Sequence, residues 1–578
     1  MLASRIVAHR IRFASRVWPA FVGALAPRAA SPALGALATL GLLLAAPGGH
    51  AAPQVARAAV ATENAVASRE AMSELDAGGN AFDAVVRAAL VSGIVSPSSS
   101  GLGGGGFALL WRAETHEPYV LDFRECAPAA VDAAAFEKRP FAPAERARAT
   151  GVPGELAGLF QLQHDFGKRA WRDVVLPAAR VAETGFPVSP HLGKVLTSAW
   201  AMGVGATDPG ISRVFFPGGK AAKAGALLKN PALGRTLRRL ANEGKTPYYE
   251  GDIGRELVAT ANEKGGALTA ADLAHYQPVR RTALHVTWEG YDVYTMPPPS
   301  AGGLLVAETL GTFSKTELAR YTPGSGVYQH LLAESMRGAL SDRLRFVGDP
   351  DFQKFDVAAL IEPARLARRK AQLISSERTH TLPRFDDDEH GTHHLLVIDQ
   401  AGNVASLTTT VNNAFGAKIT APTSGIVLND ELDDFTRQKD VVPFGLSESP
   451  NRPRPGARPV SSMTPTVVVK DGKVVFALGG SGGQLIATNV AQLLMTHLVF
   501  GLSPSELVAL PRFQVPTSGP TLRLEAGAPR ALIDDLTWRG EVVAEMPENP
   551  SAVQVIAVTE AGVSAAADPR KHGSALSK

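Results

Sequence analysis

The sequence predicts an α+β protein whose middle is rich in helices and whose C-terminal third is rich in strands. Across 54–95 and 151–370, segments with helix-like spacing alternate with Gly- and Pro-containing loops, as expected for packed helices. Beyond residue 391, β-branched runs flank turns such as Asp471-Gly472, a strong hairpin signal. A chain of 578 residues with 45% hydrophobic and 20% charged residues is an ordinary globular protein with several structural units.

The net charge bears on the classes of partner, and the cysteine content bears on disulfide bonds. A formal net charge of +3 is small for this length and gives no reason to expect nucleic acid or an anionic membrane surface as partner. The single cysteine, Cys126, excludes a disulfide within the chain, although an oxidising compartment remains open.

Residues 1–52 are predicted to be an export signal or membrane anchor rather than part of the fold. No acidic residue precedes Glu63, and five arginines precede an apolar run at 33–46. Small residues then lead to Gly49-His50-Ala51, as at a signal-peptide cleavage site. The apolar run of 14 residues is shorter than the about 20 that a membrane span needs. We therefore expect export to the periplasm or secretion, with an uncleaved anchor or an Arg-rich transit peptide as alternatives.

Two short stretches of the N-terminal half carry candidate chemistry. Four successive glycines, 103–106, precede a strand, and no Gly-Lys-Ser/Thr follows, so a tight turn is favoured over a phosphate-binding loop. The predicted strand at 119–125 ends in charge. Arg124 there is either a solvated strand end or a guanidinium that binds a substrate carboxylate.

A predicted β-hairpin begins at Gly391. Its two runs, 391–398 and 404–410, are apolar and β-branched and flank the turn Gly402-Asn403. The preceding residues, 368–390, are polar and poorly periodic, which is typical of an exposed segment. We predict that the chain is cut between Gly391 and Thr392, so that Thr392 becomes an N-terminal nucleophile.

This chemistry explains why the cut would be needed. A threonine hydroxyl is a weak nucleophile without an adjacent base, and an N-terminal threonine carries its own base, an α-amino group with an ordinary pKa of about 8. The same hydroxyl can attack the preceding carbonyl, which gives an ester that water hydrolyses. Glycine at position 391 tolerates the strained backbone that this attack requires.

The rest of the C-terminal third continues the β-rich pattern. A Pro-rich loop at 443–459 leads into a hairpin at 466–476, then Gly479-Gly480-Ser481-Gly482-Gly483, a helix at 485–502 and a last hairpin from Val553.

With these motifs in order, the chain resembles the γ-glutamyltranspeptidases, members of the N-terminal nucleophile hydrolases, from about residue 58 to 570. The landmarks are Gly103-Gly104-Gly105-Gly106-Phe107, Asp122-Phe123-Arg124-Glu125, Gly151-Val152-Pro153-Gly154, Met296-Pro297-Pro298-Pro299-Ser300, Gly348-Asp349-Pro350-Asp351-Phe352, Thr392-His393-His394, Asp433-Asp434-Phe435, Arg458-Pro459-Val460-Ser461-Ser462-Met463 and Asp568-Pro569-Arg570. The resemblance implies a four-layer αββα sandwich, with a helix-rich large subunit, 53–391, and a β-rich small subunit, 392–578.

The resemblance also implies roles for matching residues. Thr392 matches the nucleophile, Thr410 the second threonine that supports it and assists processing, and Gly482 and Gly483 the oxyanion donors. The substrate's α-carboxylate is matched to Arg124, Ser461 and Ser462, and its α-amino group to Asn412, Glu431 and Asp434.

The implied activity is γ-glutamyl transfer from a small glutathione-like donor to water or to an amino acid or peptide. No cofactor is implied, because the chain supplies nucleophile, base and oxyanion donors. A membrane is a partner only if the N-terminal segment is retained.

Two places depart from the family pattern. His393 follows the nucleophile where the family usually has Thr or Ser. In the lid loop, Phe444 stands where some members have tyrosine, and Ser447-Glu448-Ser449 replaces a glycine-rich segment. These changes concern lid behaviour and acceptor choice more than the nucleophile.

Three alternatives remain. His390, His393 and His394 with Asp386–Asp388 could ligate a metal, but the spacing matches no recognised site, and neighbouring histidines on a strand point to opposite faces. A non-catalytic scaffold relative would not be expected to keep the whole pocket. A glutaryl- or cephalosporin-type acylase of the same family would not need Asn412, Glu431 and Asp434, because a glutaryl group has no α-amino group.

Overall fold

The computed structural model describes residues 56–204, 208–376, 391–516 and 521–578. By its contacts the chain divides into residues 1–54 and one compact unit, 55–578. The predicted export segment therefore lies outside the described residues. Within the described part, no helix combines the length and apolar character that crossing a bilayer requires.

The compact unit is built on two antiparallel sheets. The seven-stranded sheet has the order β18-β1-β9-β10-β2-β3-β6, and the six-stranded sheet the order β17-β16-β12-β11-β8-β7. The first consists of β1 (Ala59–Thr62), β2 (Gly105–Arg112), β3 (Glu117–Asp122), β6 (Val279–Arg281), β9 (Gly391–Ile398), β10 (Val404–Asn412) and β18 (Ser574–Ser577). The second consists of β7 (Leu284–Trp288), β8 (Tyr291–Thr295), β11 (Thr466–Lys470), β12 (Lys473–Ser481), β16 (Ala552–Thr559) and β17 (Gly562–Ala566).

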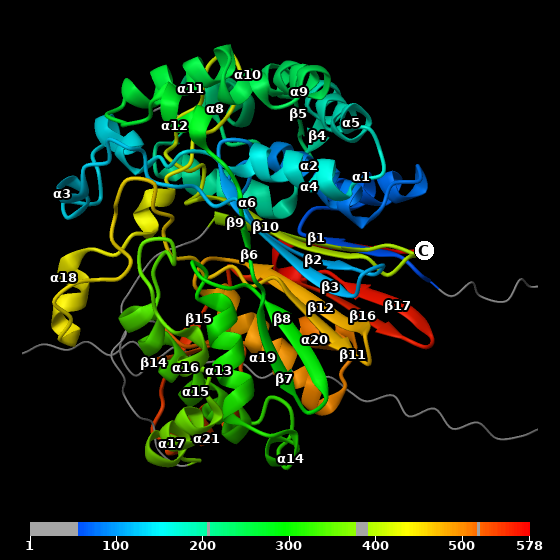
Figure 1. Cartoon of the computed structure of the whole chain (residues 1–578), viewed down its shortest axis with the longest axis vertical. Coiled ribbons are helices and arrows are strands. Elements are labelled where there is room, and N and C mark those ends of the chain that lie inside the picture. The colour runs from blue at the N-terminus through cyan, green and yellow to red at the C-terminus, as the bar shows by residue number, and fades with distance from the viewer. Residues whose placement is uncertain (1–55, 205–207, 377–390, 517–520) are drawn as a thin grey trace, which may run out of the picture. The chain divides into compact units, whose positions relative to one another are not determined.

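Helices cover the outer face of each sheet, which gives the four layers α-β-β-α (Figure 1). Over the seven-stranded sheet lie α1 (Ala65–Asp76), α2 (Ala81–Val95), α4 (Glu155–Phe166) and α5 (Trp171–Thr184). Over the six-stranded sheet lie α13 (Gly302–Thr312), α15 (Gly326–Phe346) and α19 (Leu485–Phe500). The expected αββα sandwich is therefore present.

Shorter elements complete the unit. The other helices are α3 (Ala133–Phe136), α6 (Pro190–Ala201), α8 (Pro209–Phe215), α9 (Pro231–Glu243), α10 (Thr246–Tyr249), α11 (Asp252–Asn262), α12 (Ala270–His275), α14 (Lys315–Leu318), α16 (Val357–Leu360), α17 (Pro363–Leu373), α18 (Gln438–Val441), α20 (Pro504–Ala509) and α21 (Arg530–Trp538). The 3₁₀ turns are η1 (Pro143–Ala149), η2 (Pro217–Gly219), η3 (Glu431–Asp434), η4 (Val442–Phe444) and η5 (Pro569–Lys571). Two small sheets consist of β4 (Phe186–Pro187) with β5 (Leu227–Leu228), and β13 (Phe513–Gln514) with β14 (Thr521–Glu525) and β15 (Val542–Met546).

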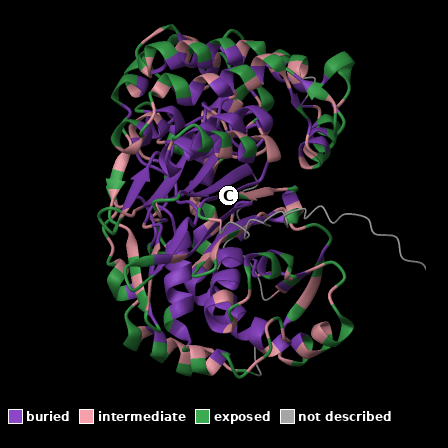
Figure 2. Cartoon of the chain, turned by 90° about the vertical axis from the view of Figure 1, so that its right-hand side faces the viewer, coloured by how far each residue is buried: buried purple, intermediate pink, exposed green. Residues whose placement is uncertain are grey.

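Strand β9 shows why the sequence forms a doubly covered sheet. Its side chains alternate between faces. Leu395 and Val397 join the core beneath the helices, whereas Leu396 and Ile398 join the core shared with the six-stranded sheet. All eight residues of β9 are buried, and both sheets lie in the buried interior in Figure 2. Because the strand is buried on both faces, its sequence is a continuous apolar run rather than a strict alternation of apolar and polar residues.

Most predicted local features are confirmed. The hairpin of β9 and β10 forms with Gly402 at a φ of +87°, and Asp471-Gly472 joins β11 to β12. The region 151–370 is mostly helical, but it also contains the short strands β4 and β5 and the strands β6, β7 and β8, and the prediction missed how much strand it contains. Tyr291–Thr295 and Leu284–Trp288 are rich in aromatic and β-branched residues, and β8 pairs with β11 of the C-terminal third.

Candidate active site

Thr392 and Thr410, the two threonines singled out by the resemblance, face each other across β9 and β10. They are directly opposed in the strand register, and both are fully buried. The Thr410 hydroxyl donates to the carbonyl oxygen of Gly391, the residue before Thr392, and accepts from the Asn412 N–H at 2.8 Å. Among the described residues, Thr392 Oγ1 has no hydrogen-bond partner. The Thr410 hydroxyl thus polarises the Gly391–Thr392 peptide, whereas the Thr392 hydroxyl makes no hydrogen bond to the described residues.

A bulge at the end of β10 directs Asn412 toward this centre. The register shifts between Thr410 and Asn412, and Asn412 has a φ of +69°, a conformation that asparagine tolerates better than most residues. Its Nδ2 donates to the carbonyl of Asp430 at 3.0 Å, while its Oδ1 has no partner among the described residues. A buried amide oxygen of this kind can receive a donor from a ligand.

The glycine run forms the tight turn that the sequence predicts. A Cβ on Gly104 would lie 1.9 Å from the carbonyl oxygen of Thr410, and a Cβ on Gly103 would lie 1.9 Å from that of Val427. Only residues without a side chain allow this approach. The loop therefore supports the backbone of the second threonine.

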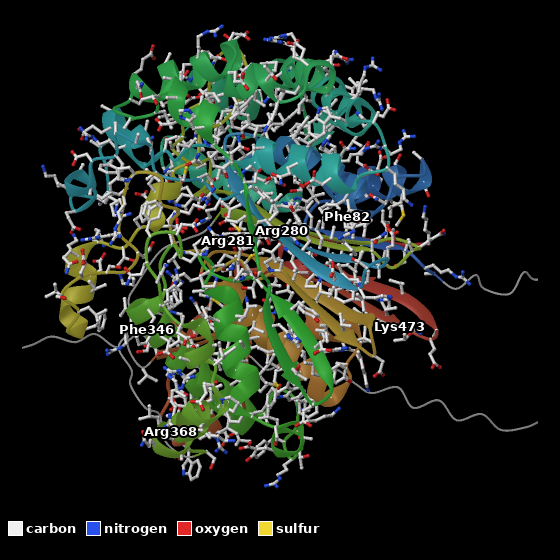
Figure 3. All side chains as sticks on the ribbon, in the orientation of Figure 1. Phe82, Arg280, Arg281, Phe346, Arg368 and Lys473 are labelled. Atoms are coloured by element: carbon white, nitrogen blue, oxygen red, sulfur yellow. The ribbon has the colours of Figure 1, made fainter. Side chains whose placement is uncertain are left out.

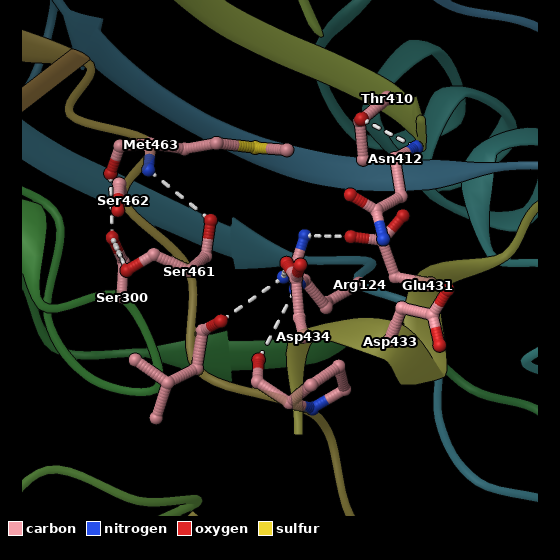
Figure 4. A network of polar contacts seen from close by, with 12 residues as sticks. Arg124, Ser300, Thr410, Asn412, Glu431, Asp433, Asp434, Ser461, Ser462 and Met463 are labelled. Atoms are coloured by element: carbon pink, nitrogen blue, oxygen red, sulfur yellow. Dashed lines mark hydrogen bonds and ion pairs between the residues drawn. The ribbon is translucent and has the colours of Figure 1, made fainter. Parts of the chain in front are cut away.

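Arg124 lies at the centre of a buried charged network, which Figure 4 shows together with Thr410 and Asn412. Its guanidinium forms ion pairs with Glu431 and Asp434, both on η3. It also donates to the carbonyls of Pro459 at 3.1 Å and Val460 at 3.2 Å. The structure therefore brings together the predicted carboxylate-binding cation and two predicted amine-binding carboxylates, from segments about 310 positions apart.

Ser461 and Ser462 follow the carbonyls that Arg124 contacts. The Ser461 hydroxyl accepts from the Met463 N–H at 3.1 Å, and both serines are buried. Ser462 Oγ accepts from the guanidinium of Arg343, on α15, at 2.9 Å. Sequence reasoning missed Arg343, because no local motif sets it apart from the neighbouring arginines of its helix.

Glu125 is a buried carboxyl beside this network that sequence reasoning did not assign. It is fully buried beside Gly105, where a Cβ would lie 2.5 Å from Glu125 Oε2. Burial raises the pKa of Glu125 to about 8, although the charge of Arg124 lowers it. Its position directly after Arg124 was the available signal.

A further set of charges holds the backbone of Arg124. Asp122 accepts from the Arg124 N–H at 2.9 Å and from Arg281 Nε at 2.7 Å, and the Tyr276 hydroxyl donates to the Arg124 carbonyl at 2.8 Å. Arg280 and Arg281 are labelled together on β6 in Figure 3. Arg281 is committed to Asp122, whereas Arg280 lies over the Tyr119 ring.

Gly482 and Gly483 lie between β12 and the N-terminal end of α19. Their φ angles are +110° and +61°, and a Cβ on Gly482 would lie 2.5 Å from the Cα of Ser551. Neither N–H donates a backbone hydrogen bond to the described residues. Unpaired amide donors at the N-terminus of a helix suit a developing negative charge.

The two histidines after Thr392 point to opposite faces, as expected. His393 Nε2 lies 3.2 Å from Ser92 Oγ on the helix side, and His394 Nδ1 lies 2.8 Å from Thr408 Oγ1 on the side facing the other sheet. Burial lowers the pKa of both, and that of His394 falls to about 3. His390 and Asp386–Asp388 lie outside the described residues.

One other cluster within the described residues has metal-like spacing: His330, Glu334 and Glu541. Arg337 forms ion pairs with both of its carboxylates, so a side-chain cation already neutralises them.

The loop that the resemblance matches to a lid makes apolar contacts. Phe444, in η4, packs with Leu446 against Leu344 and Val441. The aromatic ring that replaces a tyrosine of some family members thus belongs to a small apolar cluster.

Known proteins are similar to this chain over most of its length. A family model described as gamma-glutamyltranspeptidase matches residues 67–577. Glutathione hydrolase 2 of Arabidopsis thaliana is 36% identical over 474 residues, 78% of this chain and 79% of the relative. The glutathione hydrolase proenzyme of Pseudomonas aeruginosa is 34% identical over 566 residues, 94% of this chain and 99% of the relative.

Among solved structures, a cephalosporin acylase from Bacillus halodurans superposes with a TM-score of 0.80 at 24% identity, over 90% of this chain and 96% of that chain. At this identity the likeness shows a shared fold and nothing about the substrate. The expected fold of the N-terminal nucleophile hydrolase type is confirmed.

Proposed function

The chain belongs to the γ-glutamyltranspeptidase family, and on that premise we propose that it is a self-cleaving γ-glutamyltransferase and hydrolase. It takes the γ-glutamyl group from glutathione and related γ-glutamyl amides and passes it to water, an amino acid or a peptide. The observation that carries the proposal is the buried network of Arg124, Glu431 and Asp434 beside the Thr392–Thr410 pair.

Processing starts at the Gly391–Thr392 peptide. Thr392 Oγ1 attacks the carbonyl carbon of Gly391, whose oxygen receives the Thr410 hydroxyl. The C–N bond breaks as the Thr392 nitrogen takes up a proton, which leaves an ester on Thr392. Water hydrolyses that ester to give a carboxylate at Gly391 and a free amine and hydroxyl on Thr392. The products are a large subunit that ends at Gly391 and a small subunit of 187 residues.

The free amine then acts as the base in turnover. It accepts the Thr392 hydroxyl proton as Oγ1 attacks the γ-carbonyl, and it delivers that proton to the departing amine. The N–H groups of Gly482 and Gly483 stabilise the oxyanion, and removing one such donor costs about 2.7–4 kcal/mol in comparable enzymes. Water or an acceptor amine, deprotonated by the same base, releases the γ-glutamyl group from the acyl-enzyme.

The charged network selects the zwitterionic head of the substrate. Its α-carboxylate is held by Arg124 with Ser461 and Ser462, and its α-ammonium by Glu431, Asp434 and the uncommitted Asn412 oxygen. In the protein, the Arg124 cation is paired with the Glu431 and Asp434 anions. A ligand that carries both a carboxylate and an ammonium group matches charges of both signs.

The N-terminal segment sets the cellular location in this proposal. Residues 1–52 direct export to the periplasm or the exterior, and the protein is either released or anchored by that segment. Detection of the cleaved N-terminus in a periplasmic or medium fraction supports the proposal, and a purely cytoplasmic protein contradicts it.

The function is tested with wild type and Thr392→Ala, each examined by denaturing gel and by hydrolysis of a γ-glutamyl anilide. We expect two bands and activity for wild type, and one inactive band for the variant. A wild-type chain that stays whole yet hydrolyses the substrate would refute the mechanism. Equal kcat/KM for γ-glutamyl and glutaryl anilides would instead favour the acylase reading.

A further inference from the structure

Within the described residues, the first four residues of β9 have no neighbouring strand on the side of β1. Strand β1 ends at Thr62, which pairs with Leu395, so Gly391–His394 extend beyond it. Two side chains take its place. Glu63 Oε1 accepts from the His394 N–H at 2.9 Å, and Lys571 Nζ donates to the Thr392 carbonyl oxygen at 3.2 Å.

These side chains form one buried cluster. Lys571 Nζ lies 3.2 Å from Glu63 Oε2 and 2.5 Å from the Ser481 hydroxyl on β12. Lys571 is 3% exposed and Glu63 is 5% exposed. Burial raises the pKa of Glu63. The charges of Lys571 and, next, of His393 lower that pKa by a larger amount, so the net shift is downward. The lowered pKa favours the carboxylate form of Glu63, and its ion-pair partner Lys571 faces the backbone of Thr392.

We propose that Lys571 is a positioning residue for the reaction: its ammonium fixes the Thr392 carbonyl and keeps the adjacent N-terminal amine unprotonated near neutral pH. This rests on the proposed function, because the amine exists only after cleavage. The carbonyl and the amine belong to the same residue, so a cation on the first acts on the second at short range.

The other titratable groups around Lys571 add little charge next to the Thr392 amine. The pKa of His191, on α6, falls to about 4 through burial and the charge of Lys571, and the pKa values of His393 and His394 are lowered by burial. The neighbouring cations are committed elsewhere: Arg570 pairs with Glu525 and Asp568, and Lys194 pairs with Glu548. His572 adjoins Lys571 on η5, and Arg124 with Glu431 and Asp434 forms the head-group network.

The sign of the effect follows from charge. A nearby cation disfavours the ammonium form of the Thr392 amine and so lowers its pKa. The carboxylate of Glu63 offsets part of this lowering of the amine pKa, but it contacts the N–H of His394, two residues after Thr392. Removing the cation should therefore raise the amine pKa and move the acid limb of kcat/KM upward by about one pH unit.

The test compares pH profiles of kcat/KM for a γ-glutamyl anilide in wild type, Lys571→Met and Lys571→Met/Glu63→Gln, each measured on the cleaved fraction. The double variant avoids leaving a buried carboxylate unpaired. The control is Lys194→Met, because Lys194 lines a surface pocket together with Lys571 but donates to Glu548 rather than to Thr392. We expect the acid limb to move upward in both Lys571 variants and to stay in place in the control.

An unmoved acid limb in both Lys571 variants would overturn the inference, as would a change confined to the KM of an acceptor peptide. An equal shift in Lys194→Met would also overturn it, because the effect would then be a general one of surface charge. Absence of γ-glutamyl activity in wild type would instead refute the proposed function itself.

Discussion

Replacing Thr410 with valine isolates the role of one hydroxyl in chain cleavage. Valine keeps the β-branched shape that fits β10, and it removes both the donor to the Gly391 carbonyl and the acceptor of the Asn412 N–H. A donor aimed at a carbonyl under attack contributes about 10²–10³ in rate in comparable sites. Because a neutral hydroxyl supplies a single bond here, we expect cleavage to slow by about 100-fold, the lower end of that range.

The same change also leaves the Asn412 N–H unpaired in a buried place, which should lower the free energy of unfolding by about 1–3 kcal/mol. The assay is a denaturing-gel time course of precursor cleavage, combined with denaturant unfolding. Thr409→Val is the matched control, because that hydroxyl contacts Ser100 Oγ at 2.7 Å on the opposite face. Cleavage of Thr410→Val at the wild-type rate, or equal slowing in both variants, would refute the reasoning.

Two further predictions concern the supports of the site. Gly104→Ala places a Cβ against the Thr410 carbonyl, so we expect an uncleaved and thermally destabilised precursor; Gly311→Ala, which only displaces the Leu366 side chain, should behave like wild type. The second prediction concerns Glu125, whose pKa is raised from an ordinary 4.5 to about 8 in the folded protein. Between these two pH values the folded protein holds a proton that the unfolded chain has lost. Its stabilisation is complete below about pH 4.5 and disappears as the pH rises through about 8. Glu125→Gln should flatten the decline of melting temperature across that window, and parallel curves would contradict this.

The sequence predicted best those features that depend on neighbours in the chain. The β9–β10 hairpin follows from a turn between β-branched runs, and the β11–β12 hairpin follows from Asp471-Gly472. The glycine run was read correctly as a close approach, although the partner backbone, that of Thr410, was unknown.

The family resemblance supplied residues that local patterns cannot connect. Arg124, Glu431 and Asp434 do meet in one buried network. The residues that neither source supplied, Arg343 and Lys571, act across 119 and 179 positions. Such contacts depend on the order of strands in a sheet and on which helix covers it, which the periodicity of a single segment does not encode.

Both sheets contain strands from either side of Gly391. In the seven-stranded sheet β1 lies between β18 and β9, and β10 lies between β9 and β2; in the other sheet β11 pairs with β8. A cut after Gly391 would therefore sever covalent continuity without removing any of these ladders. Pulling the pieces apart would expose long unpaired strand edges, which favour aggregation. Exchange of subunits between molecules should thus be as slow as global unfolding, and each cleaved protein should keep the partner with which it was synthesised.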